Sequence, residues 1–324
     1  MTRGYTTEVS SDIYRAADLL WSGQLVAVPT ETVYGLAGNA LDGQAVACIF
    51  AVKNRPSFDP LICHVPDLDS VAGYVTEIPA ALRKLAEAYW PGPLTLLLPR
   101  QPIIPDLVTA GLPRVGIRVP QHPLMLELLQ ELDFPLAAPS ANPFGYISPT
   151  RPQHVVDQLG GRIPFVLDGG ICQVGVESTI VSMEAGQVTV NRKGGLAIEA
   201  IEELVGPVQV RTHSTSNPAA PGMLKSHYAP RTPIRLLPAG SIRHLELSTD
   251  TAYLTWSTIL PPEVPQRVLS PQASLQEAAQ HLFAYLRELD ALGVRQIVAE
   301  RLPERGLGRA INDRLQRAAA EPQA

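Results

Sequence analysis

Polar side chains cluster directly after the apolar run at residues 25–28, in the segment 29–35 with the sequence PTETVYG. The run predicts a buried strand, and the turn that follows it carries threonine hydroxyls, one carboxylate and a glycine. Polar groups at the point where a buried strand emerges are typical of a ligand site in an open α/β sheet. Taken alone, a threonine-rich turn is equally compatible with an ordinary connection.

Cationic side chains follow eighteen residues later, in the segment KNRPSFDPLICH, which contains Lys53, Arg55 and His64. By itself, KNRP could be a solvated helix end that is closed by proline. Beside a hydroxyl-rich turn, however, three donor groups in one short segment indicate an anionic ligand. A phosphate is the first candidate.

Five further segments place charged or hydrogen-bonding side chains next to apolar strands: VGIRVP with Arg118, PSANP with Ser140 and Asn142, SPT with Ser148, ESTI with Ser178, and NRKGG with Arg192. An arginine inside an apolar strand needs a carboxylate or phosphate partner. The two glycines of NRKGG would allow a phosphate to approach the backbone. Ser148 is also well explained as the cap of the next helix.

These residue types predict a polyphosphate ligand and exclude several other chemistries. No Ser-His-Asp order and no cysteine nucleophile stands out, so a covalent intermediate is not indicated. No HxxxH motif or carboxylate cluster predicts a metal site built by the protein, so Mg²⁺ would be carried mainly by nucleotide phosphates. The Walker A pattern GxxxxGK[ST] is absent from the sequence. We therefore predict a nucleotide enzyme without a P-loop that works by positioning and charge stabilisation.

Composition sets broad limits on the class of protein. The 324 residues suffice for two domains, and 45% hydrophobic with 18% charged residues is typical of a soluble globular protein. A net charge of -5 argues against a protein that coats nucleic acid, although a local basic pocket is compatible with it. We find neither a transmembrane run nor the apolar core of a signal peptide, so we expect a cytoplasmic protein.

Lysine and cysteine usage adds two smaller indications. Only four of the 26 basic residues are lysines, and all but Lys84 fall in candidate motifs: Lys53, Lys84, Lys193 and Lys225. Three widely spaced cysteines in apolar settings predict buried side chains, with neither a disulfide nor a zinc site: Cys48, Cys63 and Cys172.

Periodicity predicts a twisted mixed open α/β sheet for residues 1–205. We expect strands at 25–28, 61–65, 94–98, 115–119, 135–138, 164–167, 179–183 and 187–191. We expect helices at 42–52, 80–89, 123–132, 152–159 and 198–205, together with a first helix that Ser10 or Ser11 caps and that reaches Trp21.

The remaining chain divides into a linker, residues 206–232, and a second domain, residues 233–324. The linker contains PGMLKSHYAP, with Lys225, His227 and Tyr228, an unusual composition for a passive tether. We therefore expect it to act as a lid over the site. Strands at 234–237, 251–255 and 296–299, a helix at 275–292 and a last helix from about 307 predict a small three-layer, Rossmann-like α/β domain.

Seven motifs occur in an order that resembles the YrdC-type threonylcarbamoyl-AMP synthase family: PTETVYGLA, KNRPSFDPLICH, WPGPLTLLL, VGIRVP, APSAN, ESTIV and NRKGG. PGMLKSHYAP and the extra C-terminal domain resemble the long, two-domain form of that family. The resemblance implies a YrdC-like catalytic domain that makes L-threonylcarbamoyl-AMP from L-threonine, bicarbonate and ATP and releases pyrophosphate. The product would pass to a threonylcarbamoyl transferase complex that forms N6-threonylcarbamoyladenosine in tRNA.

The resemblance also implies residue roles, with no covalent nucleophile and no metal ligand. Threonine would be held by Thr32, His64, Arg118, Ala138 and Ser178. ATP would be held by Lys53, Arg55, Asp59, Arg114, Ser140, Asn142, Ser148, Arg192 and Tyr228. In this scheme Arg118 binds the threonine carboxylate, and the amine captures carbon dioxide as a carbamate that attacks the α-phosphate. His64 is either a base or a donor to threonine.

Two alternative functions stay open. A YrdC-like domain can present a concave basic surface to double-stranded RNA, so the protein could be an RNA-binding module, and weak RNA binding is also compatible with the enzyme. Carbamoyl transfer is a second enzyme reaction, because hydrogenase-maturation proteins contain a similar domain. Those proteins carry zinc-finger and acylphosphatase-like parts, which the three isolated cysteines here do not supply.

Overall fold

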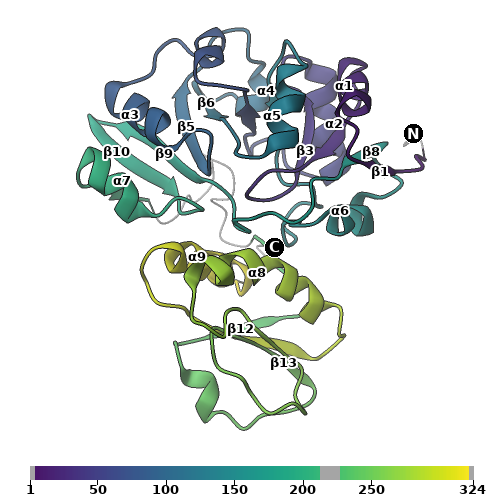
Figure 1. Cartoon of the computed structure of the whole chain (residues 1–324), viewed down its shortest axis with the longest axis vertical. Helices are drawn as coiled ribbons and strands as arrows, with labels where there is room; N and C mark the ends of the chain where they lie inside the picture. The colour runs from purple at the N-terminus through teal and green to yellow at the C-terminus, as the bar shows by residue number, and fades with distance from the viewer. Residues whose placement is uncertain (1–3, 212–226, 321–324) are drawn as a thin grey trace.

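Two α/β domains lie one above the other along the long axis of the molecule (Figure 1). This computed structural model describes residues 4–211 and 227–320. The first domain is built on a large mixed sheet, and the second on a smaller parallel sheet. Within the described residues, no helix combines the length and the apolar character that crossing a membrane requires.

The sheet of the first domain has eleven strands in the order β1-β8-β2-β3-β7-β4-β6-β5-β9-β10-β11. The sheet contains both parallel pairs, such as β4 with β6, and antiparallel pairs, such as β5 with β6, which confirms a mixed sheet. The strands are β1 (Glu8–Ser10), β2 (Val26–Val28), β3 (Gly35–Asn39), β4 (Ile62–His64), β5 (Leu94–Pro99), β6 (Arg114–Arg118), β7 (Leu136–Ala137), β8 (Phe165–Leu167), β9 (Thr179–Glu184), β10 (Gln187–Arg192) and β11 (Gln209–Val210).

The helices of the first domain bury the two faces of this sheet unequally. They are α1 (Ile13–Trp21), α2 (Gly43–Lys53), α3 (Ala80–Tyr89), α4 (Asp106–Thr109), α5 (Pro123–Gln130), α6 (Pro152–Leu159) and α7 (Ile198–Val205), with the 3-10 helix η1 (Asp69–Gly73). One face packs on α2, α3, α6 and α7 over all strands except the edge strands β1 and β11. On the other face, α1 and α5 cover only the part around β2, β3, β7 and β8.

The rest of that second face carries the polar side chains. Because strand residues alternate between faces, Cys63 and Ile117 enter the large core, whereas Ile62, His64 and Arg118 point to the opposite side. The apolar cluster on this side is small, consisting of Ile62, Leu97 and Ile180. No helix of the described residues contributes to that cluster, so the fold leaves a polar surface over β4, β6, β5 and β9.

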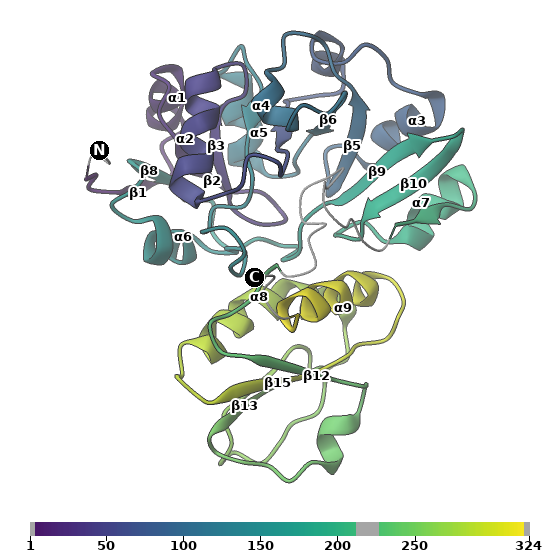
Figure 2. The same ribbon diagram turned by 180° about the vertical axis from the view of Figure 1, so that it is seen from behind.

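The second domain has four parallel strands in the order β12-β15-β13-β14. Its elements are β12 (Ile234–Leu237), η2 (Ser241–His244), β13 (Thr251–Thr255), β14 (Gln266–Val268), α8 (Leu275–Asp290), β15 (Gln296–Glu300) and α9 (Leu307–Ala318). Helices α8 and α9 cover the sheet face toward the first domain, as both views show (Figure 2). Ile242 of η2 packs with Leu260 and Val264 on the opposite face, so the predicted three layers are present.

Every expected helix and strand forms, with ends that differ by at most two residues. The strand β3 was not expected, because its sequence GLAGN contains two glycines, which weaken strand propensity. Its Gly38 has a packing reason: a Cβ there would lie 2.9 Å from Cδ2 of Leu25. The short strands β1, β11 and β14 were also missed.

Three other expectations need correction or qualification. Helix α1 is capped by Asp12, which accepts from the Arg15 N–H, because Ser10 belongs to β1. Cys48 is exposed, whereas the other two cysteines are buried as expected. Strand β11 pairs with β10 inside the range that we assigned to the linker. Residues 212–226, which include Lys225, lie outside the described residues, so the lid expectation stays a prediction.

The close approach of Gly175 to helix α8 predicts an effect on stability. Gly175 has a φ of +77°, and a Cβ there would lie 2.4 Å from the Ala279 carbonyl oxygen. We expect Gly175→Ala to lower the free energy of unfolding by roughly 2–4 kcal/mol, because it adds backbone strain and an interdomain clash. Thermal and urea unfolding measure this. Gly43→Ala is the control, because nothing lies within 4 Å of its added Cβ, and equal stability of the two variants would contradict the prediction.

Candidate active site

A cavity lies on the polar half of the first sheet, where loops and strand ends from the whole domain meet. Its empty volume is about 520 Å³, including the part open to solvent. Its lining is Thr32, Val33, Arg55, Ile62, His64, Arg118, Ala138, Pro139, Ser140, Glu177, Ser178, Arg192, His227 and Tyr228. Three arginines and a single carboxylate among these residues make the lining suitable for an anion.

Arg118, at the end of β6, is held by the turn after β2. Its Nη2 lies 2.7 Å from Oε2 of Glu31, its Nη1 donates to Oγ1 of Thr32, and its Nε donates to the Gly92 carbonyl. Glu31 therefore supplies the carboxylate partner that a buried arginine was predicted to need. The Nη2 atom is buried and makes this ion pair without hydrogen-bond geometry.

His64, at the end of β4, is a neutral side chain in this cavity. Burial, and after it the positive charge of Arg118, lowers the pKa of the His64 imidazole to about 3. The sequence grouped His64 with Lys53 and Arg55 as cationic or donor groups. The cationic role is wrong at neutral pH, because the imidazole carries no charge there.

Arg55 enters the cavity from the loop after α2. Asp59 pairs with it at 2.9 Å, and both side chains are buried. The Arg55 guanidinium also donates to the carbonyls of Asp59 and Pro60, so the loop wraps around its own arginine. Asp59 itself is not part of the cavity lining. It acts on the site through Arg55.

Lys53 and Asn142 stabilise the loop after β7 through hydrogen bonds to its carbonyl groups. The Lys53 ammonium donates to the carbonyls of Ser140 and Asn142, and its side chain is fully buried. Burial, and then repulsion from Arg55, lowers the pKa of Lys53 well below its usual value. The Asn142 amide donates to the carbonyls of Pro143 and Tyr146. Neither side chain lines the cavity, whereas Ser140 does.

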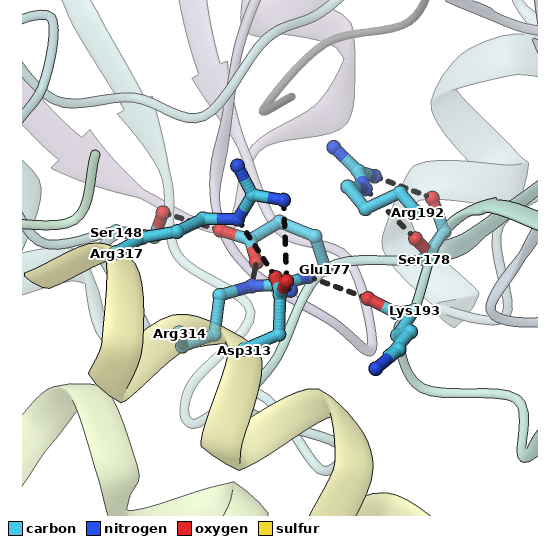
Figure 3. A network of polar contacts seen from close by, with 8 residues as sticks. All are labelled: Ser148, Glu177, Ser178, Arg192, Lys193, Asp313, Arg314 and Arg317. Atoms are coloured by element: carbon cyan, nitrogen blue, oxygen red, sulfur yellow. Dashed lines mark hydrogen bonds and ion pairs between the residues drawn. The ribbon is translucent and has the colours of Figure 1, made fainter. Parts of the chain in front are cut away.

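Glu177 and Ser178, just before β9, connect the cavity with the strand end of β10 (Figure 3). The Arg192 side chain donates through Nε to the Ser178 carbonyl and through Nη2 to its hydroxyl, at 3.1 and 3.0 Å. Burial lowers the pKa of Arg192 to about 10, so the guanidinium stays charged at neutral pH. Ser148 donates to Oε1 of Glu177 at 2.6 Å. The hydroxyl of Ser148 therefore serves a neighbouring carboxylate, and Ser148 does not line the cavity.

The glycine pair of NRKGG has a different role from the one predicted. A Cβ on Gly194 would lie 2.3 Å from the Glu177 carbonyl oxygen, and one on Gly195 would lie 2.7 Å from Cγ1 of Val174. These glycines let two segments of the chain approach each other, and thereby fix Glu177 beside Arg192. The Lys193 side chain points away from Ser178 (Figure 3).

Tyr228 closes one side of the cavity from the chain between the domains. It is 2% exposed and has a φ of 62°, a backbone conformation that is rare for a tyrosine. Its ring lies 5.6 Å from Phe283 of α8 and 4.2 Å from His227. The Ala229 N–H donates to the Gly145 carbonyl and anchors this segment on the first domain.

Nine of the fourteen predicted site residues therefore line one cavity, and five do not: Lys53, Asp59, Arg114, Asn142 and Ser148. Four of these five contact a lining residue or shape its loop. Arg114 is different, because it starts β6 and pairs with Glu184 at 2.6 Å, four residues or roughly 13 Å along the strand from Arg118.

Sequence reasoning missed four residues that contribute to this site: Glu31, Glu177, His227 and Arg314. Glu31 and Glu177 each stand within a quoted motif, so the need of a buried arginine for a carboxylate could have selected them. Arg314, in the last helix, gave no local signal. Among residues 4–211 and 227–320 no group of three or more His, Cys, Asp or Glu side chains forms a metal site.

Comparison with known proteins identifies the family of this chain. A Sua5/YciO/YrdC family model, described as telomere recombination, matches residues 18–194, and the threonylcarbamoyl-AMP synthase C-terminal domain model matches residues 196–320. The fold and the site thus define a two-domain α/β protein with a YrdC-like ligand-binding domain. The chain belongs to the Sua5/YciO/YrdC family, in its long form, which confirms the resemblance seen in the motifs.

Individual relatives support this over the full length. The threonylcarbamoyl-AMP synthase of Pyrococcus abyssi is 37% identical and that of Bacillus subtilis 38%, covering 94% and 97% of this chain and 92% and 95% of the relatives. The crystal structure of P. abyssi Sua5 complexed with L-threonine superposes with a TM-score of 0.90 at 36% identity, covering 97% of both chains.

The neutral state of His64 predicts how stability depends on pH. Its pKa is about 3 in the folded protein and about 6.5 in the unfolded chain, so between these values only the unfolded chain binds the proton. Stability must then fall as the pH falls from 6.5 toward 3, by about 1.4 kcal/mol per pH unit for this group. We expect His64→Gln to reduce the slope of unfolding free energy against pH by that amount. An unchanged slope in urea titrations between pH 4.5 and 6 would refute the assignment.

Proposed function

We propose that this protein synthesises L-threonylcarbamoyl-AMP from L-threonine, bicarbonate and ATP, with release of pyrophosphate. The observation that carries the proposal is the cavity itself, because three arginines line it and both proposed substrates carry anionic groups, a carboxylate and a polyphosphate. The same reaction is supported by the family models, which match both domains of this chain, and by the relatives named threonylcarbamoyl-AMP synthase.

The threonine end of the cavity is the part around Arg118. The side chains proposed to contact threonine are Thr32, His64, Arg118, Ala138 and Ser178, all of which line the cavity. The guanidinium donates to the threonine carboxylate, and a neutral His64 donates to or accepts from the substrate. The structure of the P. abyssi relative complexed with L-threonine supports this ligand.

The ATP end is the part around Arg55, Ser140, Arg192 and Tyr228. The two guanidinium groups bind phosphate oxygens, and charge-assisted hydrogen bonds of this kind are the strong ones. Four of the residues assigned to ATP do not line the cavity but support residues that do. Lys53 and Asn142 support the loop of Ser140, Asp59 pairs with Arg55, and Ser148 donates to Glu177. We leave Arg114 out of the ATP set, because it pairs with Glu184 at the other end of its strand.

The chemistry follows from placing both substrates in one cavity. The threonine amine condenses with bicarbonate, loses water and becomes a carbamate. A carbamate oxygen attacks the α-phosphorus of ATP in line, and the bond to the β-phosphate breaks to release pyrophosphate. Arg55 and Arg192 stabilise the charge that develops on the phosphates, and the cavity provides proximity and orientation.

The remaining cofactor and partner assignments follow from this reaction. Mg²⁺ is expected to be carried by the ATP phosphates, since the cavity lining contains only one carboxylate. The labile product would pass to a threonylcarbamoyl transferase complex that modifies tRNA. A cytoplasmic location is expected, because the proposed substrate ATP is found there.

Pyrophosphate release should require both L-threonine and bicarbonate, because the carbamate is the nucleophile. A coupled pyrophosphate assay with ATP, and with each co-substrate omitted in turn, measures this. Labelled bicarbonate should appear in a threonylcarbamoyl-AMP product by mass spectrometry. Equal pyrophosphate release without threonine would refute the proposed function.

Arg192→Ala should lower turnover strongly, whereas Arg114→Ala should leave turnover nearly unchanged. Arg192 lines the cavity, so we expect its loss to weaken ATP binding and to lower turnover by about a hundredfold or more, as removal of a charge-stabilising donor does. Arg114 pairs with Glu184 away from the cavity, so its substitution should leave turnover within about twofold, which is the size of a surface ion-pair effect. Calorimetry with ATP and steady-state kinetics test both, and near-normal ATP binding by Arg192→Ala would contradict the assignment.

A further inference from the structure

Arg314 makes a buried polar contact between the two domains. This residue belongs to α9 of the C-terminal domain, and its side chain is 0% exposed. Its Nε lies 2.8 Å from Oε2 of Glu177, and its Nη2 donates to the Lys193 carbonyl at 3.0 Å. Both partners belong to the first domain (Figure 3). A side chain from the second domain therefore reaches the wall of the cavity.

Arg314 and Ser148 occupy both oxygens of the Glu177 carboxylate. Ser148 donates to Oε1, while Arg314 binds Oε2. Burial alone would raise the pKa of Glu177, but Arg314 and then Arg192 outweigh it and hold that pKa below its usual value. The Glu177 carboxylate is thus ionised, and the charge of Arg314 and the hydrogen bond from Ser148 stabilise its negative charge.

This compensation matters because Glu177 lines the cavity beside Arg192. A buried carboxylate without its partner would repel a phosphate ligand and compete with that ligand for the Arg192 guanidinium. With Arg314 paired to Glu177, the negative charge at this wall of the cavity is compensated. The C-terminal domain therefore sets the charge of a cavity that lies in the first domain.

Arg314 also contacts the segment between the domains. Its Cζ lies 5.0 Å from the ring centroid of Tyr228, in the cation–π range. Asp313 accepts from both Arg314 and Arg317, and the Arg317 carbonyl accepts from the His227 N–H. Helix α9 therefore positions Tyr228 and His227, which line the cavity, as well as Glu177.

We propose that Arg314 is a positioning residue for the nucleotide end of the site, and that the C-terminal domain completes this end by neutralising Glu177 and holding Tyr228. The inference depends on the proposed function only in taking ATP as the ligand. It assigns no chemical step to Arg314, which does not line the cavity.

A double-mutant cycle on ATP binding tests the electrostatic part. We expect Arg314→Met to raise the ATP dissociation constant by about tenfold or more, since it leaves a buried charge unpaired, while threonine binding changes less. Arg314→Lys keeps the charge without the fork, and its affinity should lie between wild type and Arg314→Met. Adding Glu177→Gln to Arg314→Met should restore much of the lost affinity, because the unpaired carboxylate is removed.

A second ion pair across the same interface gives a matched control. Arg309, also on α9, lies 3.3 Å from Glu199 of α7 and is partly exposed. Arg309→Met should therefore leave ATP affinity unchanged, with circular dichroism and thermal unfolding confirming folded variants. The inference is overturned if Arg314→Met binds ATP as well as Arg309→Met does, or if the effects of Arg314→Met and Glu177→Gln simply multiply.

A crystal structure of Arg314→Met separates this inference from the proposed function. Displaced Glu177 and Tyr228 side chains support a positioning role even if the wild-type protein releases no pyrophosphate, an outcome that would refute only the function. Side chains that stay in place in the variant would overturn the inference even if the wild type is active.

Discussion

The site depends on pairing buried arginines with buried carboxylates. Arg118 pairs with Glu31, Arg55 with Asp59, and Arg314 with Glu177, and all six side chains are almost completely buried. An isolated charge in such surroundings would be strongly destabilising, and removal of one member of a buried pair typically costs about 3–5 kcal/mol. The pairs therefore keep cationic groups at the wall of a cavity that an anion can enter.

This requirement explains why so many different segments build one cavity. Two of the pairs join residues from distant parts of the fold: Glu31 lies in the turn after β2 and Arg118 at the end of β6, while Glu177 precedes β9 and Arg314 lies in α9. The third pair, Arg55 with Asp59, lies within one loop. A guanidinium held at several of its nitrogens is also fixed in orientation. Charge compensation and geometric precision thus come from the same contacts.

The sheet determines where such a cavity can form. Helices bury one face except at its edge strands and only part of the other, so the strands β4, β6, β5 and β9 can present polar side chains on the uncovered part. The second domain then contributes where the first domain has no helix of its own. Through α8, it supplies Phe283 beneath Tyr228, and through α9 it supplies Arg314. The two domains are therefore linked by the site as well as by their packing.

Local sequence determined a large share of this protein. Apolar periodicity located most helices and strands, because each must bury one face. Residue types next to strand ends, together with the family resemblance, located nine of the lining side chains. The ordered motifs determined the family. Weak local signals explain what was lost: the glycine-rich β3 has low strand propensity, and Asp12 competes with Ser10 and Ser11 as a cap.

Only the tertiary structure decided what each polar residue contacts. Arg114 and Arg118 lie in the same strand on the same face, yet one pairs with Glu184 and the other with Glu31, because the two strand ends meet different neighbours. The glycines of NRKGG suggested a phosphate, but close packing of the Glu177 segment explains them. Arg314 has no motif at all, since its role depends on a contact with Glu177, 137 positions away in the chain. Long-range pairing of buried charges is a property of the folded chain, and local sequence patterns do not encode it.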